Sequence, residues 1–361
     1  MLVNKAYRYE LKPNKNQLVL LKKHAGCARF AWNWGLAERI RLWEQEGKAT
    51  NAIEQHRELN RLKRTDYLWM YEVSKCAPQE ALRNLDRAFR NFFEGRANFP
   101  RFKKKGIHDS FRLTGTIKVF PKHVQLPRLG KVRVKEETAK FKGKILSATV
   151  SREADRWYVS LAVEVEIPNP LPVQGDLVGI DRGLIHFAVL STGEKVEAPK
   201  SLEKSLKKLC RLSRQLSRKQ KGSKNRKKAA LRLARLHCKI KNQRRDFLHK
   251  LSTWLAKTKS AIVVEDLAVK NMIRNKHLSR HIADAGWSEF RRMLEYKTKW
   301  YGSRLVVAPR FYPSSRRCSE CGYVLLELKL STRHWVCPEC GAIHDRDVNA
   351  AINLLQCLNS V

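Results

Sequence analysis

Three carboxylates occupy positions in the sequence from which they could hold divalent cations. Asp181 ends the apolar run VGID, Glu265 ends the run IVVE, and Asp347 lies in DRDVN at the start of a predicted helix. Acids gathered at one place repel one another and stay ionised only with a cation between them. Mg²⁺ suits such oxygen ligands, and two Mg²⁺ ions about 4 Å apart can promote phosphodiester hydrolysis. The pattern therefore predicts a metal-dependent hydrolytic site built from these three acids.

Two neighbouring acids are expected to serve the structure instead. Asp266 directly follows Glu265 and would point to the other face of the strand. Asp345 precedes the last predicted helix and suits its N-terminal cap. In the RNase H-like nuclease fold, acids from the ends of two strands and from the start of one helix come together. We predict this fold for this part of the chain.

Four cysteines near the end of the sequence form two C-x-x-C pairs separated by fifteen residues. The two thiolates of each pair can reach one tetrahedral ion, and this spacing is typical of a zinc ribbon. Because protein would fill all four positions around the ion, the predicted zinc is structural, and its binding is coupled to folding. His344 follows the second pair, and we expect a polar surface histidine there, with a proton shuttle as the alternative. The predicted zinc ligands are Cys318, Cys321, Cys337 and Cys340.

The chain carries a large excess of positive charge. Its 361 residues include 74 Lys and Arg against 34 Asp and Glu, a formal net charge of +40. A compact protein with this charge repels itself unless a polyanion is present, and nucleic-acid phosphates neutralise it with release of counterions. The composition therefore predicts a nucleic-acid partner, and the length predicts two or three domains.

The sequence gives no sign of export or of membrane insertion. No apolar run approaches the roughly 20 residues that span a bilayer, and the start MLVNKAYRYE lacks a signal-peptide pattern. Nine cysteines are an odd number, which argues against a disulfide scaffold and favours a reducing compartment, the cytoplasm. The five cysteines outside the C-x-x-C pairs are expected to be small reduced apolar residues. They are Cys27, Cys76, Cys210, Cys238 and Cys357.

The first half of the sequence alternates between two kinds of pattern. Residues 3–12 predict a strand, residues 17–95 predict helices, and residues 97–166 predict short strands with basic residues between them. A small barrel closed by the N-terminal strand, with the helical block inserted, fits this order. The aromatic residues of the helices, among them Trp43 and Phe93, are expected in the core rather than as platforms for bases.

The prolines in IPNPLPVQGD predict a boundary, because proline cannot continue a strand ladder. Beyond it the pattern predicts two long helices, about 201–219 and 226–257, and leucines at steps of three and four predict a buried stripe on the first. Residues 201–250 hold 19 Lys and Arg against two acids. The remaining predicted elements are strands near 177–180, 186–191, 194–197, 261–264 and 305–307 and helices near 286–301 and 347–357.

Seven segments spread over essentially the whole chain carry a resemblance to a known family. They are YRYELKPNKNQ, GCARFAWNWGLA, FFEGRANFPRFKKKGIHDSF, GIDRGL, IVVEDLAVKNM, YPSSRRCSECG and WVCPECGAIHDRDVNAAINLL. In this order they resemble the landmarks of the TnpB family, the OrfB-type transposon-associated nucleases related to type V CRISPR effectors. The last two segments are the most specific.

The resemblance implies an α+β multidomain architecture. A wedge-like β-barrel with an inserted helical recognition lobe would be followed by a RuvC-like nuclease domain, and a zinc-ribbon insertion near its cleft would gate or hold the substrate strand. The implied segments are 1–15 and 100–170 for the barrel, 16–99 for the helical lobe, 171–314 and 343–361 for the nuclease domain with its basic helical hairpin at 201–257, and 315–342 for the zinc ribbon.

The resemblance also implies RNA-guided cleavage of double-stranded DNA next to a short flanking motif. A guide RNA transcribed from the transposon end would pair with one target strand, and the paired strands would be held by charge and backbone shape. The protein would act as a monomer on one RNA, in the cytoplasm at the nucleoid. Asp181, Glu265 and Asp347 match the three RuvC acids, which bind catalytic Mg²⁺. Gln79 lies in the region that faces the flanking duplex in relatives, and Arg182 replaces an aliphatic residue expected after the first acid.

Three other functions stay open at this point. An RNA-guided DNA-binding repressor without cleavage would be expected to lack one of the three acids, all of which are present. A transposase acting at transposon ends would work without RNA. A type V CRISPR effector would be expected to be longer.

Overall fold

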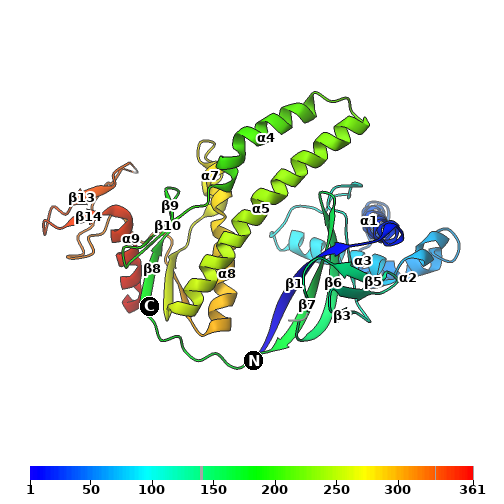
Figure 1. Ribbon diagram of the computed structural model, residues 1–361, viewed down its shortest axis with the longest axis horizontal. Coiled ribbons are helices and arrows are strands. Elements are labelled where there is room, and N and C mark those ends of the chain that lie inside the picture. Colours follow the sequence, from blue (N-terminus) through cyan, green and yellow to red (C-terminus); the bar gives the residue numbers. More distant parts are fainter. Residues whose placement is uncertain (139–140, 330, 361) are drawn as a thin grey trace. The chain divides into compact units, whose positions relative to one another are not determined.

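The computed structural model describes residues 1–138, 141–329 and 331–360, and it divides into two compact units (Figure 1). Unit 1 is Met1–Ile167 and unit 2 is Pro168–Val361, so the boundary falls at the start of the proline-rich segment. Within the described ranges, no helix combines the length and the apolar character needed to cross a bilayer.

Unit 1 is built around a seven-stranded sheet with the strand order β2-β6-β7-β1-β5-β4-β3. The long first strand is central, because it pairs with β7 over most of its length and with β5 at its end. In chain order the elements are β1 (Leu2–Lys12), α1 (Lys15–Glu46), α2 (Ala52–Leu62), η1 (Leu68–Glu72), α3 (Cys76–Phe93), β2 (Ser110–Leu113), β3 (Lys118–Phe120), β4 (His123–Leu126), β5 (Gly130–Val134), β6 (Lys144–Glu153) and β7 (Arg156–Glu166).

The sheet of unit 1 is curled but not closed. Among the described residues β2 and β3 end the strand order without pairing with each other, so the prediction of a closed barrel is wrong. Residues 114–117 join these two strands. Such a link spans at most about 18 Å, whereas seven flat strands would separate the edges by about 29 Å. The sheet therefore bends until its edges approach, but Gly115, at φ +95°, turns the chain between the short edge strands instead of extending either one.

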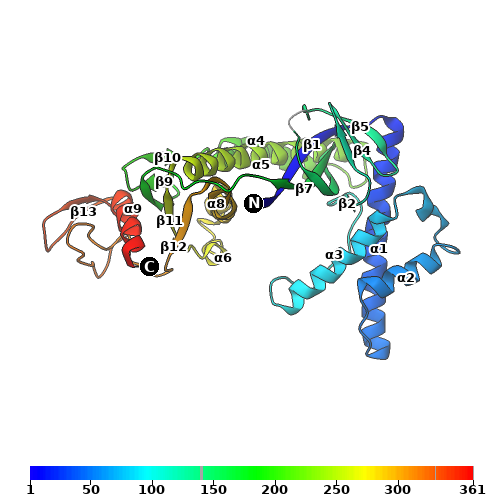
Figure 2. The same ribbon diagram turned by 90° about the horizontal axis from the view of Figure 1, so that it is seen from below.

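Helix α1 begins and ends at the signals its sequence provides. Asn14 and Gln17 form a capping box at its start, and Gly47 ends it with a left-handed φ of +62°. Its middle packs against α3 (Figure 2). A Cβ on Gly35 would lie 2.6 Å from a methyl group of Leu82, so glycine permits the close approach of the two helices.

The predicted burial of the helical aromatics holds for only part of them. Trp32 lies in the core, but Trp43 is 66% exposed and Phe93 is 78% exposed. The buried residues of α1 end at Leu36 and those of α3 end at Leu85. Both helices therefore continue past the region where they cover the core, and their last turns carry aromatic side chains at the surface.

Unit 2 is built around a five-stranded sheet with the order β10-β9-β8-β11-β12. The pairs β10/β9 and β9/β8 are antiparallel, whereas β11 is parallel to both β8 and β12. In chain order the elements are β8 (Leu177–Asp181), β9 (His186–Leu190), β10 (Lys195–Glu197), α4 (Ser201–Ser217), α5 (Lys224–Thr258), β11 (Ala261–Glu265), α6 (Val269–Met272), α7 (Ser279–Ala285), α8 (Trp287–Tyr301), β12 (Arg304–Ala308), β13 (His334–Val336), β14 (Ile343–Asp345), α9 (Arg346–Gln356) and η2 (Cys357–Ser360).

The two long basic helices form an antiparallel hairpin (Figure 1). The C-terminal half of α5 is buried against α8 through residues such as Leu248 and Phe290. The leucines of α4 were predicted to be buried, but in the structure they are only half-buried. Helix α4 packs mainly against α5, and one neighbouring helix cannot cover an apolar stripe completely.

Candidate active site and cysteine cluster

Asp181 and Glu265 end two neighbouring parallel strands. Strands β8 and β11 are in register, with Ile180 opposite Val264, so the next residue on each strand is an acid. The buried residues Val178, Ile180, Ile262 and Val264 fix both strands in the core. Because the carboxyl ends of parallel strands lie at one edge of a sheet, the two acids lie side by side at that edge.

Helix α9 brings Asp347 to the same edge. It packs directly on β8 at Gly179, where a Cβ would lie 1.9 Å from the carbonyl oxygen of Ala351. The Asp345 carboxylate caps the helix by accepting hydrogen bonds from the backbone amides of Asp347 (3.0 Å) and Val348 (3.1 Å). The predicted cap is thus confirmed, and Asp347 lies in the first turn with its carboxylate outside the cap.

The electrostatics of Asp181 show that the three acids influence one another. Burial, and after it the negative charges of Glu265 and Asp347, raise the pKa of Asp181 to about 8. An acid with this pKa is mostly protonated at neutral pH unless a cation lies beside it. Carboxylates are suitable donors for a hard divalent cation, but these three acids are not gathered as tightly as the four cysteines of the C-x-x-C pairs. The magnesium site therefore stays a prediction.

Ser314 is a partner of this site that sequence reasoning missed. Its hydroxyl donates a hydrogen bond of 2.7 Å to the Glu265 carboxylate, and its side chain is buried. Its carbonyl oxygen accepts a hydrogen bond of 2.8 Å from the Asn353 side chain on α9. Ser314 therefore connects the acid on β11 to the helix that carries Asp347. The segment YPSSRRCSECG was singled out in the sequence, but nothing local to it indicated this role.

Arg182 is buried beside the acids, and its side chain contacts β11. The Arg182 guanidinium donates to the backbone carbonyl of Glu265. Burial lowers the pKa of Arg182 to about 10, which still leaves the group charged at neutral pH. Arg182 therefore places a fixed cation between the ends of β8 and β11.

The neighbouring acid Asp266 is engaged in ion pairs, as expected for a structural residue. Its carboxylate oxygens lie 2.5 Å from Arg291 and 2.6 Å from Arg310. Hydrogen bonds from Arg310 and then from Arg291 lower the pKa of Asp266. Both oxygens are thus occupied by guanidinium groups, unlike those of Glu265.

The four cysteines of the C-x-x-C pairs come together in the structure. Their sulfur atoms all lie within 4.8 Å of one another, and within the described part of the chain no other group of Cys, His, Asp or Glu meets this test. Four thiols at such distances suit a tetrahedral zinc ion. The sulfurs of Cys318 and Cys340 are 3.7 Å apart and those of Cys321 and Cys337 are 3.5 Å apart.

Each cysteine pair is held by the same turn. The amide of Gly322 donates to the carbonyl of Cys318 (3.0 Å), and the amide of Gly341 donates to that of Cys337 (2.9 Å). The φ angles of these glycines are +80° and +75°, a left-handed conformation that glycine adopts without strain. The C-x-x-C-G sequence thus explains why both pairs form matching turns.

His344 lies beside the cysteine cluster and not at the surface, so the expected surface histidine is wrong. Its Nε2 is 3.1 Å from the sulfur of Cys318, and its ring packs on Trp335 with centroids 4.7 Å apart. The pairing of Trp335 with His344 between β13 and β14 places the ring there. Each of these strands has only three residues, which is too few for the sequence to predict which side chains are buried.

Helix α9 holds the backbone on both sides of Cys318 by hydrogen bonds. The buried side chain of Asn349 donates to the carbonyl of Arg317 (2.8 Å) and accepts from the amide of Ser319 (3.0 Å). Asn353, one turn later, also donates to the carbonyl of Arg317 (2.6 Å). Cys318 is therefore fixed through both of its backbone neighbours by the helix that carries Asp347.

Comparison with known proteins identifies the family. The chain is 40% identical over 98% of its length to a Streptomyces pristinaespiralis protein described as "Putative RNA-guided DNA endonuclease", and it covers 89% of that protein. It is 36% identical to the Escherichia coli protein "Putative RNA-guided DNA endonuclease InsQ", covering 97% of this chain and 91% of that one. The chain belongs to the TnpB (OrfB) family.

Three family models match parts of this TnpB-family chain. Residues 160–276 match OrfB_IS605, described as "Probable transposase", and residues 287–354 match the Cas12f1-like TNB domain, which includes the cysteine cluster. Residues 1–48 match a model described as a helix-turn-helix domain. The structure of that segment is instead a strand followed by a single helix, β1 and α1.

A solved structure shares the fold of this TnpB-family chain. It is the cryo-EM structure of the Cas12f1-sgRNA-target DNA complex, with a TM-score of 0.60 and 13% sequence identity, and the match covers 98% of this chain and 99% of that one. The fold is thus a Cas12f1-like arrangement of sheets and helices.

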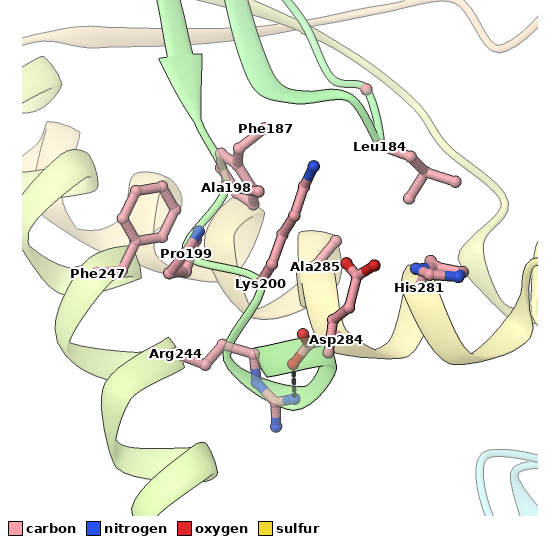
Figure 3. Close-up of a pocket in the computed structure, with 12 residues that line it drawn as sticks. Leu184, Phe187, Ala198, Pro199, Lys200, Arg244, Phe247, His281, Asp284 and Ala285 are labelled. Atoms are coloured by element: carbon pink, nitrogen blue, oxygen red, sulfur yellow. Dashed lines mark hydrogen bonds and ion pairs between the residues drawn. The ribbon is translucent and has the colours of Figure 1, made fainter. Parts of the chain in front are cut away.

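A small pocket lies near the turn after β8, and Asp284 and Arg244 are among the residues that line it (Figure 3). Its volume is about 40 Å³, which holds a few water molecules but no nucleotide. Lys200 precedes α4 with a left-handed φ of +46° and gives that helix no side-chain cap. Asp284 supplies it instead by accepting from the amide of Leu202 (3.0 Å), and Arg244 lies 3.5 Å from the same carboxylate.

Gln79 lines a groove in unit 1. The groove has a volume of about 510 Å³, and it collects hydrogen-bonding side chains from α3, β4 and the turn after β4. Among them are Gln125 and Arg128, and the Arg128 side chain is presented by a backbone with φ +64°. Glutamine and arginine are the side chains that most often read adenine and guanine edges in the major groove.

Proposed function

We propose that this TnpB-family chain is an RNA-guided DNA endonuclease of a transposon, acting as a monomer on one guide RNA in the bacterial cytoplasm. The observation that carries the proposal is the convergence of Asp181, Glu265 and Asp347 from β8, β11 and α9. Burial and the charges of the other two acids raise the pKa of Asp181. Relatives at 36–40% identity bear the name RNA-guided DNA endonuclease, which supports the same assignment.

The three acids would hold Mg²⁺ and align the scissile phosphate. Bound Mg²⁺ supplies charge to the phosphate and lowers the pKa of the attacking water. Ser314 holds one oxygen of Glu265 by a hydrogen bond, which leaves the other oxygen for the cation. Arg182 holds the end of β11 through the Glu265 carbonyl, so the spacing of the first two acids is fixed before substrate arrives.

The charge distribution supports RNA and DNA as the partners. The hairpin of α4 and α5 contributes much of the excess, and most of its Lys and Arg residues are exposed. Such a surface neutralises phosphates without reading sequence, as a guide paired with its target requires. The groove around Gln79 has the chemistry to read bases, and we assign the short flanking motif to it.

The zinc ribbon would serve the site through α9. Four thiolates around zinc would fix Arg317 and Ser319, which Asn349 and Asn353 bind. The ribbon would then restrain the helix that presents Asp347.

The decisive test is cleavage by the protein co-expressed with its own flanking transposon DNA. A plasmid with a guide-matched target beside randomised flanks should be cut in Mg²⁺ next to one enriched flank. Ribonuclease treatment and Asp181→Asn should each abolish cutting, while Asp176→Asn, an exposed acid just before β8, should leave it unchanged. Guided binding without cutting would establish the repressor instead, and cutting at transposon ends without RNA would establish a transposase.

A further inference from the structure

A groove in unit 1 is lined by aromatic side chains that the protein leaves uncovered. It lies between the C-terminal turns of α1 and α3 and has a volume of about 560 Å³. Phe93 is 78% exposed, Trp43 is 66% exposed and Phe99 is 45% exposed. Large uncovered apolar surfaces of this kind mark binding sites. The aromatic residues of this surface, here named the aromatic groove, are Trp43, Phe89, Phe92, Phe93 and Phe99.

The inner rings of the aromatic groove are held in place by one another. The Phe99 ring meets those of Phe89 and Phe92 edge-on, with centroids 5.5 and 5.4 Å apart. The Arg39 guanidinium lies 4.9 Å from the centroid of Phe89 on the α1 side. Phe93 packs against Phe92 at 5.3 Å while most of its surface stays exposed. The groove therefore presents rigid ring surfaces, which lose little conformational entropy when a flat group stacks on them.

The charge around the aromatic groove selects a phosphate-bearing occupant. On the α3 side, residues 87–105 contain seven Lys and Arg and one acid, whereas on the α1 side residues 37–48 contain three of each, so the excess of positive charge lies on the α3 side. Arg90, Arg96 and Arg101, which flank the exposed rings in sequence, are themselves exposed. Aromatic faces interleaved with basic side chains are the combination that binds single-stranded nucleic acid, because bases stack on the rings and phosphates meet the cations.

The exposed ring surfaces also indicate which strand occupies the groove. A duplex hides its base faces, whereas loops and ends of RNA present unstacked bases. Target DNA is a transient partner, but a guide RNA stays bound, and a permanently bound partner is the one that can keep this apolar surface covered. We propose that the aromatic groove stacks unpaired nucleotides of the guide RNA. This inference rests on the proposed function, which supplies the RNA.

Photocrosslinking tests the inference at the level of single residues. The full-length protein would be mixed with a short oligouridylate containing 5-iodouridine, irradiated, and digested for peptide mass spectrometry. Crosslinks are expected on the peptides that contain Trp43 or Phe93. The double substitution Trp43→Ala and Phe93→Ala should lower oligouridylate affinity about tenfold, as loss of stacking predicts. Tyr71→Ala, which removes an exposed aromatic residue of unit 1 outside the groove (51% exposed), should leave the affinity unchanged.

Three results would overturn the inference. Oligouridylate that binds and crosslinks only elsewhere, with unchanged affinity in the double variant, would exclude the groove while leaving the proposed function intact. A dimer in sedimentation that Phe93→Ala dissociates would show that a second copy of the chain covers the groove. Absence of any RNA binding by the wild-type protein would instead remove the proposed function itself. Both rings are exposed, so circular dichroism should show the double variant folded.

Discussion

Gly179 of β8 lies against the carbonyl oxygen of Ala351 on α9 so closely that a Cβ on the glycine would come within 1.9 Å of it. The same Cβ would lie 2.8 Å from the backbone nitrogen of Leu355. Both contacts are with helix backbone, which cannot move aside as a side chain could. The separation between β8, which ends in Asp181, and α9, which begins near Asp347, is therefore set by the absence of one methyl group.

We expect Gly179→Ala to push α9 away from β8. Overpacking of this kind costs about 3 kcal/mol of unfolding free energy, and the displacement should reduce cleavage more than it reduces RNA binding. Thermal unfolding and single-turnover cleavage would measure the two effects. Gly193→Ala is the matched control, because nothing lies within 4 Å of a Cβ there, although its φ of +85° makes a small loss of stability expected. Unchanged cleavage by folded Gly179→Ala would show that the spacing of β8 and α9 is not critical.

Substituting in turn the two acids at the start of α9 should show which one binds the metal ion and which one only caps the helix. Asp347→Asn should lower the cleavage rate by about 1,000-fold, since metal ions contribute several kcal/mol and each 1.36 kcal/mol is a factor of ten. Asp345→Asn should retain most of the rate, because asparagine also accepts the hydrogen bonds of a helix N-terminus. The opposite ranking of the two rates would exchange the assigned roles.

The raised pKa of Asp181 predicts how stability changes with pH in buffer without Mg²⁺. Its folded-state pKa of about 8 lies above the ordinary value of 3.8, so between these pH values the folded state binds more protons than the unfolded state. Stability from this group is complete below about pH 4 and is lost as the pH rises towards 8. The melting temperature of Asp181→Asn should therefore exceed that of the wild type by more at pH 8 than at pH 5. A difference that does not depend on pH would contradict the raised pKa.

Arg182 should affect catalysis through the position of Glu265. Arg182→Met leaves the Glu265 carbonyl without the donor it has in the structure, and an unsatisfied buried carbonyl costs about 1–3 kcal/mol. We expect a lower cleavage rate at saturating Mg²⁺ with unchanged affinity for guide RNA. Arg182→Lys, which keeps a donor, should recover part of the rate. A rate in Arg182→Met equal to that of the wild type would show that the contact is dispensable.

Loss of one thiol should remove zinc and weaken the acid site together. Cys318→Ser should lower the zinc content measured by inductively coupled plasma mass spectrometry. It should also reduce cleavage, because without zinc the segment around Arg317 and Ser319 would lose its fixed position and would no longer restrain α9 through Asn349 and Asn353. The control is Cys210→Ser, which changes a half-buried cysteine of α4 outside the cluster. This variant should keep both zinc and activity. One zinc per chain in Cys318→Ser would mean that the cysteines are not the ligands.

Local patterns in the sequence were enough for the elements and for the residues with chemistry. Continuous apolar runs predicted β8 and β11, each ending in an acid. The segment DRDVN predicted both the cap at Asp345 and the start of α9. The two C-x-x-C pairs and the fifteen residues between them predicted the cysteine cluster, because each pair is close enough in sequence to reach one ion. The excess of Lys and Arg predicted nucleic-acid partners.

Only the tertiary structure decided how these parts meet. The contact of Gly179 with α9, the hydrogen bond from Ser314 to Glu265 and the burial of His344 join residues far apart in the chain, and no local pattern encodes such distances. The same reason explains the wrong predictions. Whether a sheet closes, and whether aromatic residues such as Phe93 are covered, depends on where neighbouring elements end in space, which the order of residues along one helix or strand does not specify.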